Sequence, residues 1–278
     1  MLVYLNGELI PSDQARVPVD DRGFLFADGV YEVARVYDGR IFKMPEHLRR
    51  MAHGLAAIRI DFPEIGGLAQ VGERLLDENG LRSGGATIYI QVTRGVAPRK
   101  HAFPAGVRPT VFLAARAYQD APAASWEEGV AAIRYPDIRW ARCDIKSVAL
   151  LANVLANQAA HEVDAFEALF VRDGVVIEGS HSNLAAVIDG TVVTYPRSNY
   201  ILPGITREIV LQLARDAAIP VREGPIYDHE LFRVQELFLL GTTTEVMPVV
   251  RVDGQPIANG RPGPVTKRLI ELYRQATR

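Results

Sequence analysis

The feature that most constrains the fold of this sequence is a recurring Asn-Gly or Asp-Gly pair placed between short apolar segments. Such pairs favour tight hairpin turns between antiparallel strands. They stand at Asn6-Gly7, Asp38-Gly39, Asp173-Gly174 and Asp189-Gly190. In the second half of the chain the turns separate strand-like segments at 167–171, 175–178 and 184–188. We therefore predict an antiparallel, hairpin-rich sheet there, rather than β–α–β units.

The other segments add helices and suggest a domain boundary. Apolar residues recur at helical spacing after Pro45, and a second helix is expected over 65–79. Residues 120–125 are small and polar, as is typical of a linker. Because 278 residues exceed a typical single domain, we predict a small N-terminal domain at 1–119 and a larger C-terminal domain at 126–278, in an α+β fold.

Composition excludes several classes of protein. With 48% hydrophobic and 23% charged residues the chain can bury a sizeable core, and its net charge of −2 argues against nucleic acid as a partner. The single cysteine, Cys143, permits neither an internal disulfide nor a cysteine-based metal site. We find no signal peptide, and no apolar run approaches the ~20 residues of a membrane span. We therefore expect a cytoplasmic protein that binds neither a membrane nor nucleic acid.

Lys146 is one of only four lysines, and it stands between a short strand-like segment and an apolar run. We expect that run to form a buried helix, with its apolar positions at Val148, Leu150, Leu151, Val154 and Leu155. A lysine in this place either extends its ammonium group to water or loses its proton. An unprotonated amine is a nucleophile that can form a Schiff base with an aldehyde cofactor.

Two polar segments of the first half allow two interpretations each. The predicted strand 30–37 carries Tyr31 on one face and Glu32 on the other, and its unusually polar face meets water or lines a site. The loop after residue 94 carries Arg99 and His101 two positions apart, so that both point the same way in an extended chain. The loop is either solvated or binds a carboxylate.

Two later segments could hold an anion, and a nearby carboxylate could pair with a cofactor. Ile205 and Thr206 open a predicted helix, where free backbone N–H groups favour anions. Thr242 lies in a hydroxyl-rich turn after an apolar strand, and Arg50 offers a cation. Glu178 ends an apolar strand, either as an ordinary strand-end carboxylate or as the partner of a protonated ring nitrogen.

Six blocks occur in the order found in one enzyme family. They are Phe26 to Glu32, Arg99 to His101, Cys143 to Ser147, Glu178 to Asn183, Gly204 to Arg207 and Gly241 to Glu245. In these blocks the chain resembles the fold-type IV pyridoxal-phosphate transaminases, most closely the D-amino-acid transaminases. The resemblance implies a two-domain α+β fold with a small N-terminal domain and a larger pseudo-barrel domain that binds pyridoxal 5′-phosphate.

The resemblance also implies a role for each candidate residue. Lys146 would be the Schiff-base lysine and the catalytic base, and Glu178 would pair with the pyridine nitrogen. Four residues would hold the cofactor phosphate, namely Arg50, Ile205, Thr206 and Thr242. Three would bind the substrate carboxylate, namely Tyr31, Arg99 and His101, the last two reaching the neighbouring site of a homodimer. The implied substrates are D-amino acids such as D-alanine and D-glutamate, with pyruvate or 2-oxoglutarate as acceptor.

Other functions stay open at this point. The same fold is similar to branched-chain L-amino-acid transaminases, aminodeoxychorismate lyases and R-selective amine transaminases, and a binding protein with an unreactive Lys146 is a different class again. Within the blocks, His181 stands where the best-known relatives have a serine near the phosphate, and Pro203 replaces a lysine. We interpret Cys143 as a small buried residue rather than a nucleophile.

Overall fold

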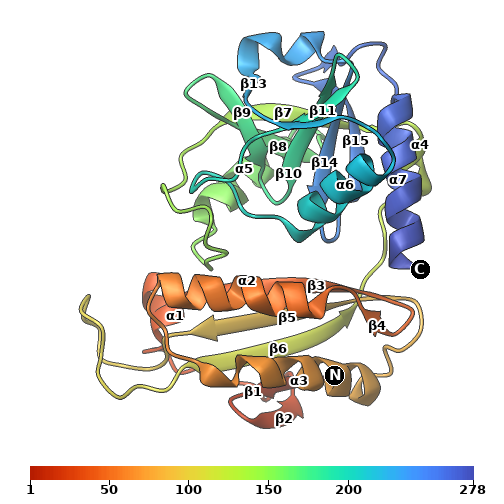
Figure 1. Ribbon diagram of the computed structural model, residues 1–278. Coiled ribbons are helices and arrows are strands. Elements are labelled where there is room, and N and C mark those ends of the chain that lie inside the picture. The colour runs from red at the N-terminus through yellow and green to blue at the C-terminus, as the bar shows by residue number, and fades with distance from the viewer. The chain divides into compact units, whose positions relative to one another are not determined.

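The computed structural model describes all 278 residues, which form two compact units (Figure 1). The first unit contains Met1–Asp120 and Ile145–Ala149, and the second contains Ala121–Asp144 and Leu150–Arg278. The short segment that carries Lys146 therefore belongs to the first unit, although the chain on both sides of it belongs to the second. The division into separate domains at 120–125 stays a prediction. None of the helices is long and apolar enough to span a membrane.

The first unit is an antiparallel sheet of six strands in the order β2-β1-β6-β5-β3-β4. Its strands are β1 (Leu2–Leu5), β2 (Glu8–Pro11), β3 (Gly29–Tyr37), β4 (Arg40–Ile41), β5 (Gly85–Thr93) and β6 (Thr110–Ala117). Its helices are α1 (Arg22–Phe26), α2 (Met44–Ala57), the 3-10 helix Pro63–Gly67 and α3 (Leu68–Glu78). The predicted helix over 65–79 is thus divided into a 3-10 turn and α3.

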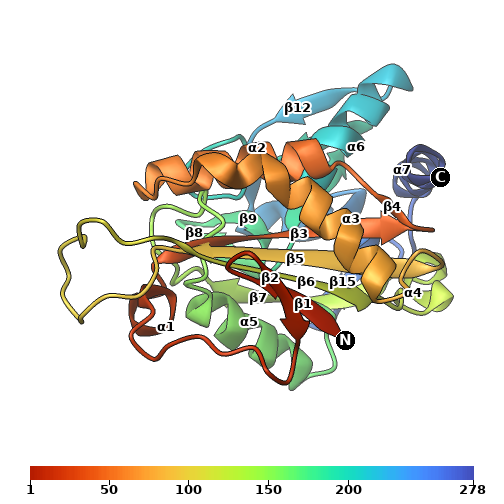
Figure 2. The same ribbon diagram turned by 90° about the horizontal axis from the view of Figure 1, so that it is seen from below.

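The core of the first unit lies between one face of this sheet and two helices. The alternate residues Val30, Ala34 and Val36 of β3 are buried against apolar side chains of α2 and α3, such as Met51 and Leu75. Figure 2 shows both helices on the same side of β3 and β5. Burial of alternate strand residues fixes the register of β3, because a slip by one residue would turn this face to water.

Residues 146–148 extend the sheet at the edge of β3 that β5 does not cover. Ser147 forms a bridge with Val30, the Tyr31 N–H donates to the Lys146 carbonyl at 2.9 Å, and the Val148 N–H donates to the Gly29 carbonyl at 3.1 Å. This backbone pairing, rather than a helix, places Lys146.

The second unit is built on a ten-stranded sheet that closes on itself. Its strands are β7 (Val130–Pro136), β8 (Glu167–Arg172), β9 (Val175–Gly179), β10 (Asn183–Ile188), β11 (Thr191–Thr194), β12 (Val221–Glu223), β13 (Ile226–Tyr227), β14 (Glu236–Gly241), β15 (Glu245–Val252) and β16 (Gln255–Pro256). Neighbouring strands run β10-β14-β15-β7-β8-β9, and β9 pairs again with β10 through Glu178 and Asn183. This last pairing completes a barrel-like ring, as the pseudo-barrel implied by the resemblance requires.

Helices surround this sheet, and two of them correct a prediction. The helices are α4 (Ala123–Glu127), α5 (Leu151–His161), α6 (Ile205–Asp216), the 3-10 helix Asp228–Arg233 and α7 (Pro264–Thr277). The expectation of no β–α–β units was wrong, because α5 connects the parallel strands β7 and β8, and α6 lies between the parallel strands β11 and β12. Asp-Gly turns indicate only local pairings, whereas a helical crossover returns the chain to the same end of the sheet.

The predicted buried face of the helix after Lys146 was also wrong. Helix α5 begins at Leu151, and the side chains of Leu151, Val154 and Leu155 are 72%, 58% and 47% exposed in the single chain. The residues of α5 that are buried are Ala156 and Ala160. The run is apolar on two sides, so periodicity alone could not tell which side faces the core.

Candidate active site

Lys146 lies beside an aromatic side chain of β3. Its side chain is half-buried, and its Nζ atom is 4.4 Å from the centroid of the Tyr31 ring. The Tyr31 ring stacks on Tyr89, with centroids 5.8 Å apart, and the Tyr89 hydroxyl donates to the Gln91 side chain at 2.6 Å. Burial raises the pKa of Tyr89 to about 12. The stacked rings thus present a fixed, uncharged face to the lysine amine.

On the other face of β3, Glu32 is fully buried and bound by two residues of α2. Arg50 donates from Nε and Nη2 to the two carboxylate oxygens at 2.7 and 2.8 Å, and His47 Nδ1 lies 2.8 Å from Oε2. Burial opposes ionisation of Glu32, but Arg50 and His47 outweigh it and lower its pKa to about 2. Burial also lowers the pKa of His47. This face of β3 is therefore a buried ionic cluster, not a solvated surface.

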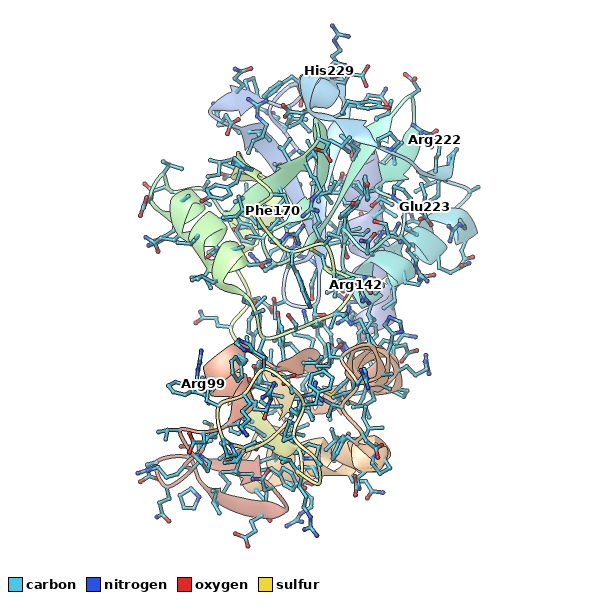
Figure 3. The ribbon with its side chains drawn as sticks, turned by 90° about the vertical axis from the view of Figure 1, so that its left-hand side faces the viewer. Arg99, Arg142, Phe170, Arg222, Glu223 and His229 are labelled. Carbon is cyan, nitrogen blue, oxygen red and sulfur yellow. The ribbon has the colours of Figure 1, made fainter.

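Arg99 and His101 occupy an exposed loop whose base is firmly held. The Arg99 guanidinium lies 5.1 Å from the centroid of the Phe26 ring, and the His101 ring lies 5.4 Å from it (Figure 3). The loop backbone accepts hydrogen bonds from Arg22 at Lys100 and His101. Arg22 is in turn held by Asp28. Within one chain the structure brings Arg99 and His101 to Phe26 and not to Tyr31.

Asp28 also fixes the strand end from which this loop departs. Its carboxylate is bound by Arg22 at 2.8 Å and by Arg94 at 2.7 Å. Burial raises the pKa of Asp28, but Arg94 and Arg22 outweigh it, and the net shift is downward. A buried cluster of one carboxylate and two guanidinium groups thus keeps an exposed loop in one position.

Glu178 is a buried carboxylate of the second unit. Its Oε2 accepts hydrogen bonds from the Asn183 side chain and from the Leu202 backbone N–H, both at 3.0 Å. Its Oε1 accepts from Arg139 Nη1. Burial raises the pKa of Glu178 to about 7 even though Arg139 lowers it. A carboxylate that exchanges a proton near neutral pH suits pairing with a basic ring nitrogen.

Arg139 and Asp137 were not assigned a role from the sequence, yet they form the surroundings of Glu178. Asp137 is fully buried and binds both Arg139 and Arg172 at 2.9 Å. The Arg139 guanidinium also lies 4.1 Å from the centroid of the Phe170 ring. The available signal was the spacing of Asp137 and Arg139, which places both on one side of an extended segment.

Three backbone segments of the second unit meet at the predicted phosphate residues. Gly204 precedes Ile205 and Thr206 at the start of α6, and a Cβ atom at Gly204 would overlap Asn183 Oδ1. A Cβ atom at Gly241, which precedes Thr242, would lie 3.5 Å from Ser182 Cβ. The start of α6 and the β14–β15 turn therefore both lie against residues 182–183. This close approach of backbone, with no room for a side chain, is typical of a phosphate cradle.

The residues of this second unit that depart from the family pattern lie at the same place. His181 is 44% exposed, and its backbone N–H donates to the buried Glu167 at 2.7 Å. Glu167 also binds the Ser182 N–H at 3.1 Å and its hydroxyl at 2.9 Å. Pro203 is half-buried directly before Gly204. Glu167 thus fixes the β9–β10 turn whatever the side chain at position 181.

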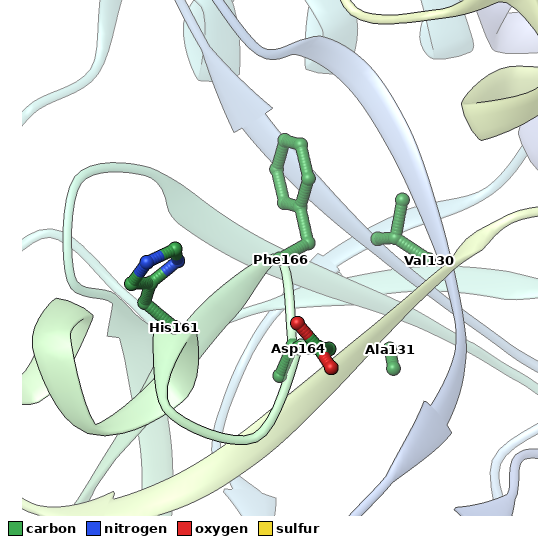
Figure 4. A pocket seen from close by; sticks show the side chains of 6 residues that line it. Val130, Ala131, His161, Asp164 and Phe166 are labelled. Atoms are coloured by element: carbon green, nitrogen blue, oxygen red, sulfur yellow. The ribbon is translucent and has the colours of Figure 1, made fainter.

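A hollow of about 360 Å³ lies elsewhere on the second unit (Figure 4). It is lined by Val130, Ala131, His161, Asp164, Ala165 and Phe166. It contains none of the residues described above.

Comparison with known proteins identifies the family. The sequence profile of the family Amino-transferase class IV matches residues 29–252, so the chain is a class IV aminotransferase. Among curated proteins, it is 42% identical to the D-alanine aminotransferase of Staphylococcus haemolyticus over 98% of this chain and 96% of the relative. It is 44% identical to the D-alanine aminotransferase of Bacillus licheniformis over 97% and 94% of the two chains.

Solved structures agree on the fold. The branched-chain amino acid aminotransferase of Escherichia coli superposes with a TM-score of 0.89 at 28% identity, over 96% of this chain and 91% of the other. A second branched-chain amino acid aminotransferase, that of T.th., solved with pyridoxamine 5′-phosphate, gives a TM-score of 0.91 at 26% identity, over 99% and 93%. The fold-type IV assignment and the two-part α+β fold are confirmed.

The cofactor of this family is pyridoxal phosphate, and each unit supplies groups that fit it. The first unit offers the half-buried amine of Lys146 beside Tyr31. The second offers the buried carboxylate of Glu178 and the close-packed turns before Ile205 and Thr242. Arg50 has two of its nitrogens on Glu32. Cys143 is buried, and burial raises the pKa of its thiol to about 11, which agrees with a structural rather than nucleophilic role.

Proposed function

We propose that the protein transfers the amino group between D-amino acids, such as D-alanine and D-glutamate, and 2-oxo acids, such as pyruvate and 2-oxoglutarate. The observation that carries this proposal is identity of 42–44% to D-alanine aminotransferases over nearly the whole of both chains. The branched-chain relatives share the fold at 26–28% identity.

Within this function, we assign roles by the chemistry of each group. When bound, pyridoxal phosphate supplies a ring that stabilises negative charge at the substrate's α-carbon. Lys146 Nζ attaches the cofactor and moves the proton at that carbon. Glu178 holds the ring nitrogen. Arg50, Ile205, Thr206 and Thr242 hold the phosphate, the last three with N–H and O–H donors.

Tyr31, Arg99 and His101 bind the α-carboxylate in this proposal, the latter two from the partner of a homodimer. Both side chains are exposed in the single chain, and their loop is anchored through Arg22 to the buried Asp28. A rigid, exposed, cationic loop is what a site on a second copy needs. We include a cytoplasmic location in the proposal, supported by the single, buried cysteine.

The stereochemistry is tested with the cofactor-loaded protein and the two enantiomers of alanine. D-Alanine discharges the visible absorption band of the cofactor within seconds, and L-alanine leaves it unchanged. Discharge by L-leucine or L-valine instead would favour the branched-chain alternative, which the structural neighbours represent.

The carboxylate assignment is tested with Arg99→Ala. The variant loses at least about tenfold in kcat/KM for D-alanine, since a charged hydrogen bond is worth about 1.5–3 kcal/mol. It changes little for an amine without a carboxylate. Equal losses for both substrates would assign Arg99 to another role.

A further inference from the structure

Four charged side chains of alternating sign form a continuous series of ion pairs in the second unit. Arg172 Nε lies 2.9 Å from Asp137 Oδ2, Arg139 Nε lies 2.9 Å from Asp137 Oδ1, and Arg139 Nη1 donates to Glu178. We call Arg172, Asp137 and Arg139 the charge ladder.

The charge ladder is buried and held on several sides. Asp137 is fully buried, and Arg139 is 7% exposed. Arg139 also donates to the Tyr200 carbonyl at 3.3 Å, and Arg172 Nη2 donates to the Arg139 carbonyl at 3.1 Å. Their guanidinium groups lie over the rings of Phe170 and Tyr200, at 4.1 and 4.5 Å (Phe170 is labelled in Figure 3). The charges therefore keep their positions relative to Glu178.

We propose that the charge ladder consists of positioning residues that set how strongly the Glu178 carboxylate holds a proton, and thereby set the protonation of the cofactor's ring nitrogen. This inference rests on the proposed role of Glu178. It adds a means of control from residues that touch neither substrate nor cofactor.

The signs of the charges explain the effect. In a buried site, charges act on one another over several ångströms because little water screens them. Arg139 favours the ionised form of Glu178, whereas Asp137 opposes it. Asp137 thus offsets part of the influence of Arg139, and Arg172 offsets part of that of Asp137. The remaining titratable group near this cluster is the Cys143 thiol, whose raised pKa keeps it uncharged.

The balance matters because either extreme would weaken the electron-withdrawing ring. A carboxylate fully neutralised by Arg139 attracts the ring-nitrogen proton weakly. One left without Arg139 becomes protonated itself, and no longer offers a negative charge to the ring nitrogen. Burial against one cation, with a second anion behind it, leaves the pKa of Glu178 at about 7, between these extremes.

The test is an NMR titration of the cofactor-free protein with ¹³C-labelled glutamate side chains, the Glu178 signal being assigned by its loss in Glu178→Gln. Asp137→Asn lowers the midpoint of Glu178 by about one pH unit, Arg139→Met raises it by at least as much, and Arg172→Met raises it by less. Arg139→Lys, which keeps the charge, restores most of the original midpoint.

The alternation of sign separates tuning from simple packing. If these residues only held the fold, every substitution would admit water and lower the midpoint toward that of a free glutamate. A lowered or unchanged midpoint in Arg139→Met and Arg172→Met would therefore overturn the proposal. Arg142 and Asp144 form a matched control, because they make a more exposed pair on the same segment, at 2.9 Å. Arg142→Gln and Asp144→Asn leave the midpoint unchanged.

A second measurement separates the failure of this inference from that of the proposed function. In protein loaded with ¹⁵N-ring-labelled pyridoxal phosphate, Glu178→Gln moves the ring-nitrogen signal toward the unprotonated position, and Asp137→Asn moves it part of the way. A shift with Glu178→Gln but none with Asp137→Asn overturns only the charge ladder. No shift with Glu178→Gln overturns the role of Glu178 itself.

Discussion

At the scale of single residues, two buried glutamates show how neighbours decide what a carboxylate does. Glu32 is bound by Arg50 and His47, and its pKa falls to about 2. Glu178 is bound by one arginine that is itself shared with Asp137, and its pKa rises to about 7. The first carboxylate is therefore a permanent anion that holds α2 to β3. The second can exchange a proton under physiological conditions.

The Glu32 cluster makes the protein sensitive to acid. Because the pKa of Glu32 is lower in the folded than in the unfolded state, its contribution to stability is present above about pH 4.5 and is lost as the pH falls toward 2. The contribution is of the order of 3 kcal/mol. Glu32→Gln lowers the free energy of unfolding at pH 7 and flattens its decline between pH 5 and 3, as measured by urea unfolding. An unchanged slope would refute this account of the cluster.

Glu178 has the opposite effect in the cofactor-free protein. Its pKa is higher in the folded state, so its ionisation costs stability above about pH 7, and this cost disappears as the pH falls from 7 through 4.5. Glu178→Gln therefore stabilises the cofactor-free protein at pH 8 by up to about 3 kcal/mol and has less effect at pH 5. Thermal unfolding at both pH values measures it. A variant less stable than the original at pH 8 would contradict the prediction.

Sequence reasoning reached those residues whose roles follow from local motifs. Lys146, Glu178 and the Gly204–Thr206 segment lie in ordered blocks that resemble one family. Asp137, Arg139 and His47 were missed as functional candidates, because their roles depend on partners 30 or more positions away in some cases, such as Glu178 for Arg139. Charged residues in a sequence look solvated until the folded chain provides their partners.

At the scale of elements, the strands were predicted well and their connections less well. Period-two alternation identified β3 and β5, and the Asn-Gly and Asp-Gly pairs identified the hairpins, since both signals are local. The parallel pairing of β7 with β8 was not visible, because it depends on the path of α5. The exposed side of α5 was misassigned for a related reason: both its sides are apolar.

The start of α6 provides a prediction at this scale. Gly204→Ala places a methyl group on Asn183 Oδ1, and Asn183 also binds Glu178. We expect cofactor affinity, measured by equilibrium titration, to fall by at least about tenfold, because displacing a close-packed buried group costs about 1–3 kcal/mol. Gly66→Ala is the control, since its Cβ atom would meet nothing within 4 Å. Equal affinity in both variants would argue against the cradle.

At the scale of the whole molecule, the exposed apolar side of α5 supports assembly. Leu151, Val154 and Leu155 lie together on one helix and are largely exposed in the single chain. Contiguous apolar surface of this kind is typical of a protein interface. The double variant Val154→Glu, Leu155→Glu is expected to sediment as a monomer and to lose activity, since Arg99 and His101 then have no neighbouring site.

Its control is Tyr227→Ser, which removes an exposed side chain from β13 and leaves α5 intact. This variant is expected to sediment as the unchanged protein does. A double variant that sediments as a dimer would place the interface elsewhere.

The central claim of this account is that Lys146 carries pyridoxal phosphate. The most direct measurement is borohydride reduction of the cofactor-loaded protein followed by peptide mapping. The account predicts one modified peptide, containing Lys146, and unmodified peptides containing Lys43, Lys100 and Lys267. Modification of another lysine, or of none, would contradict it.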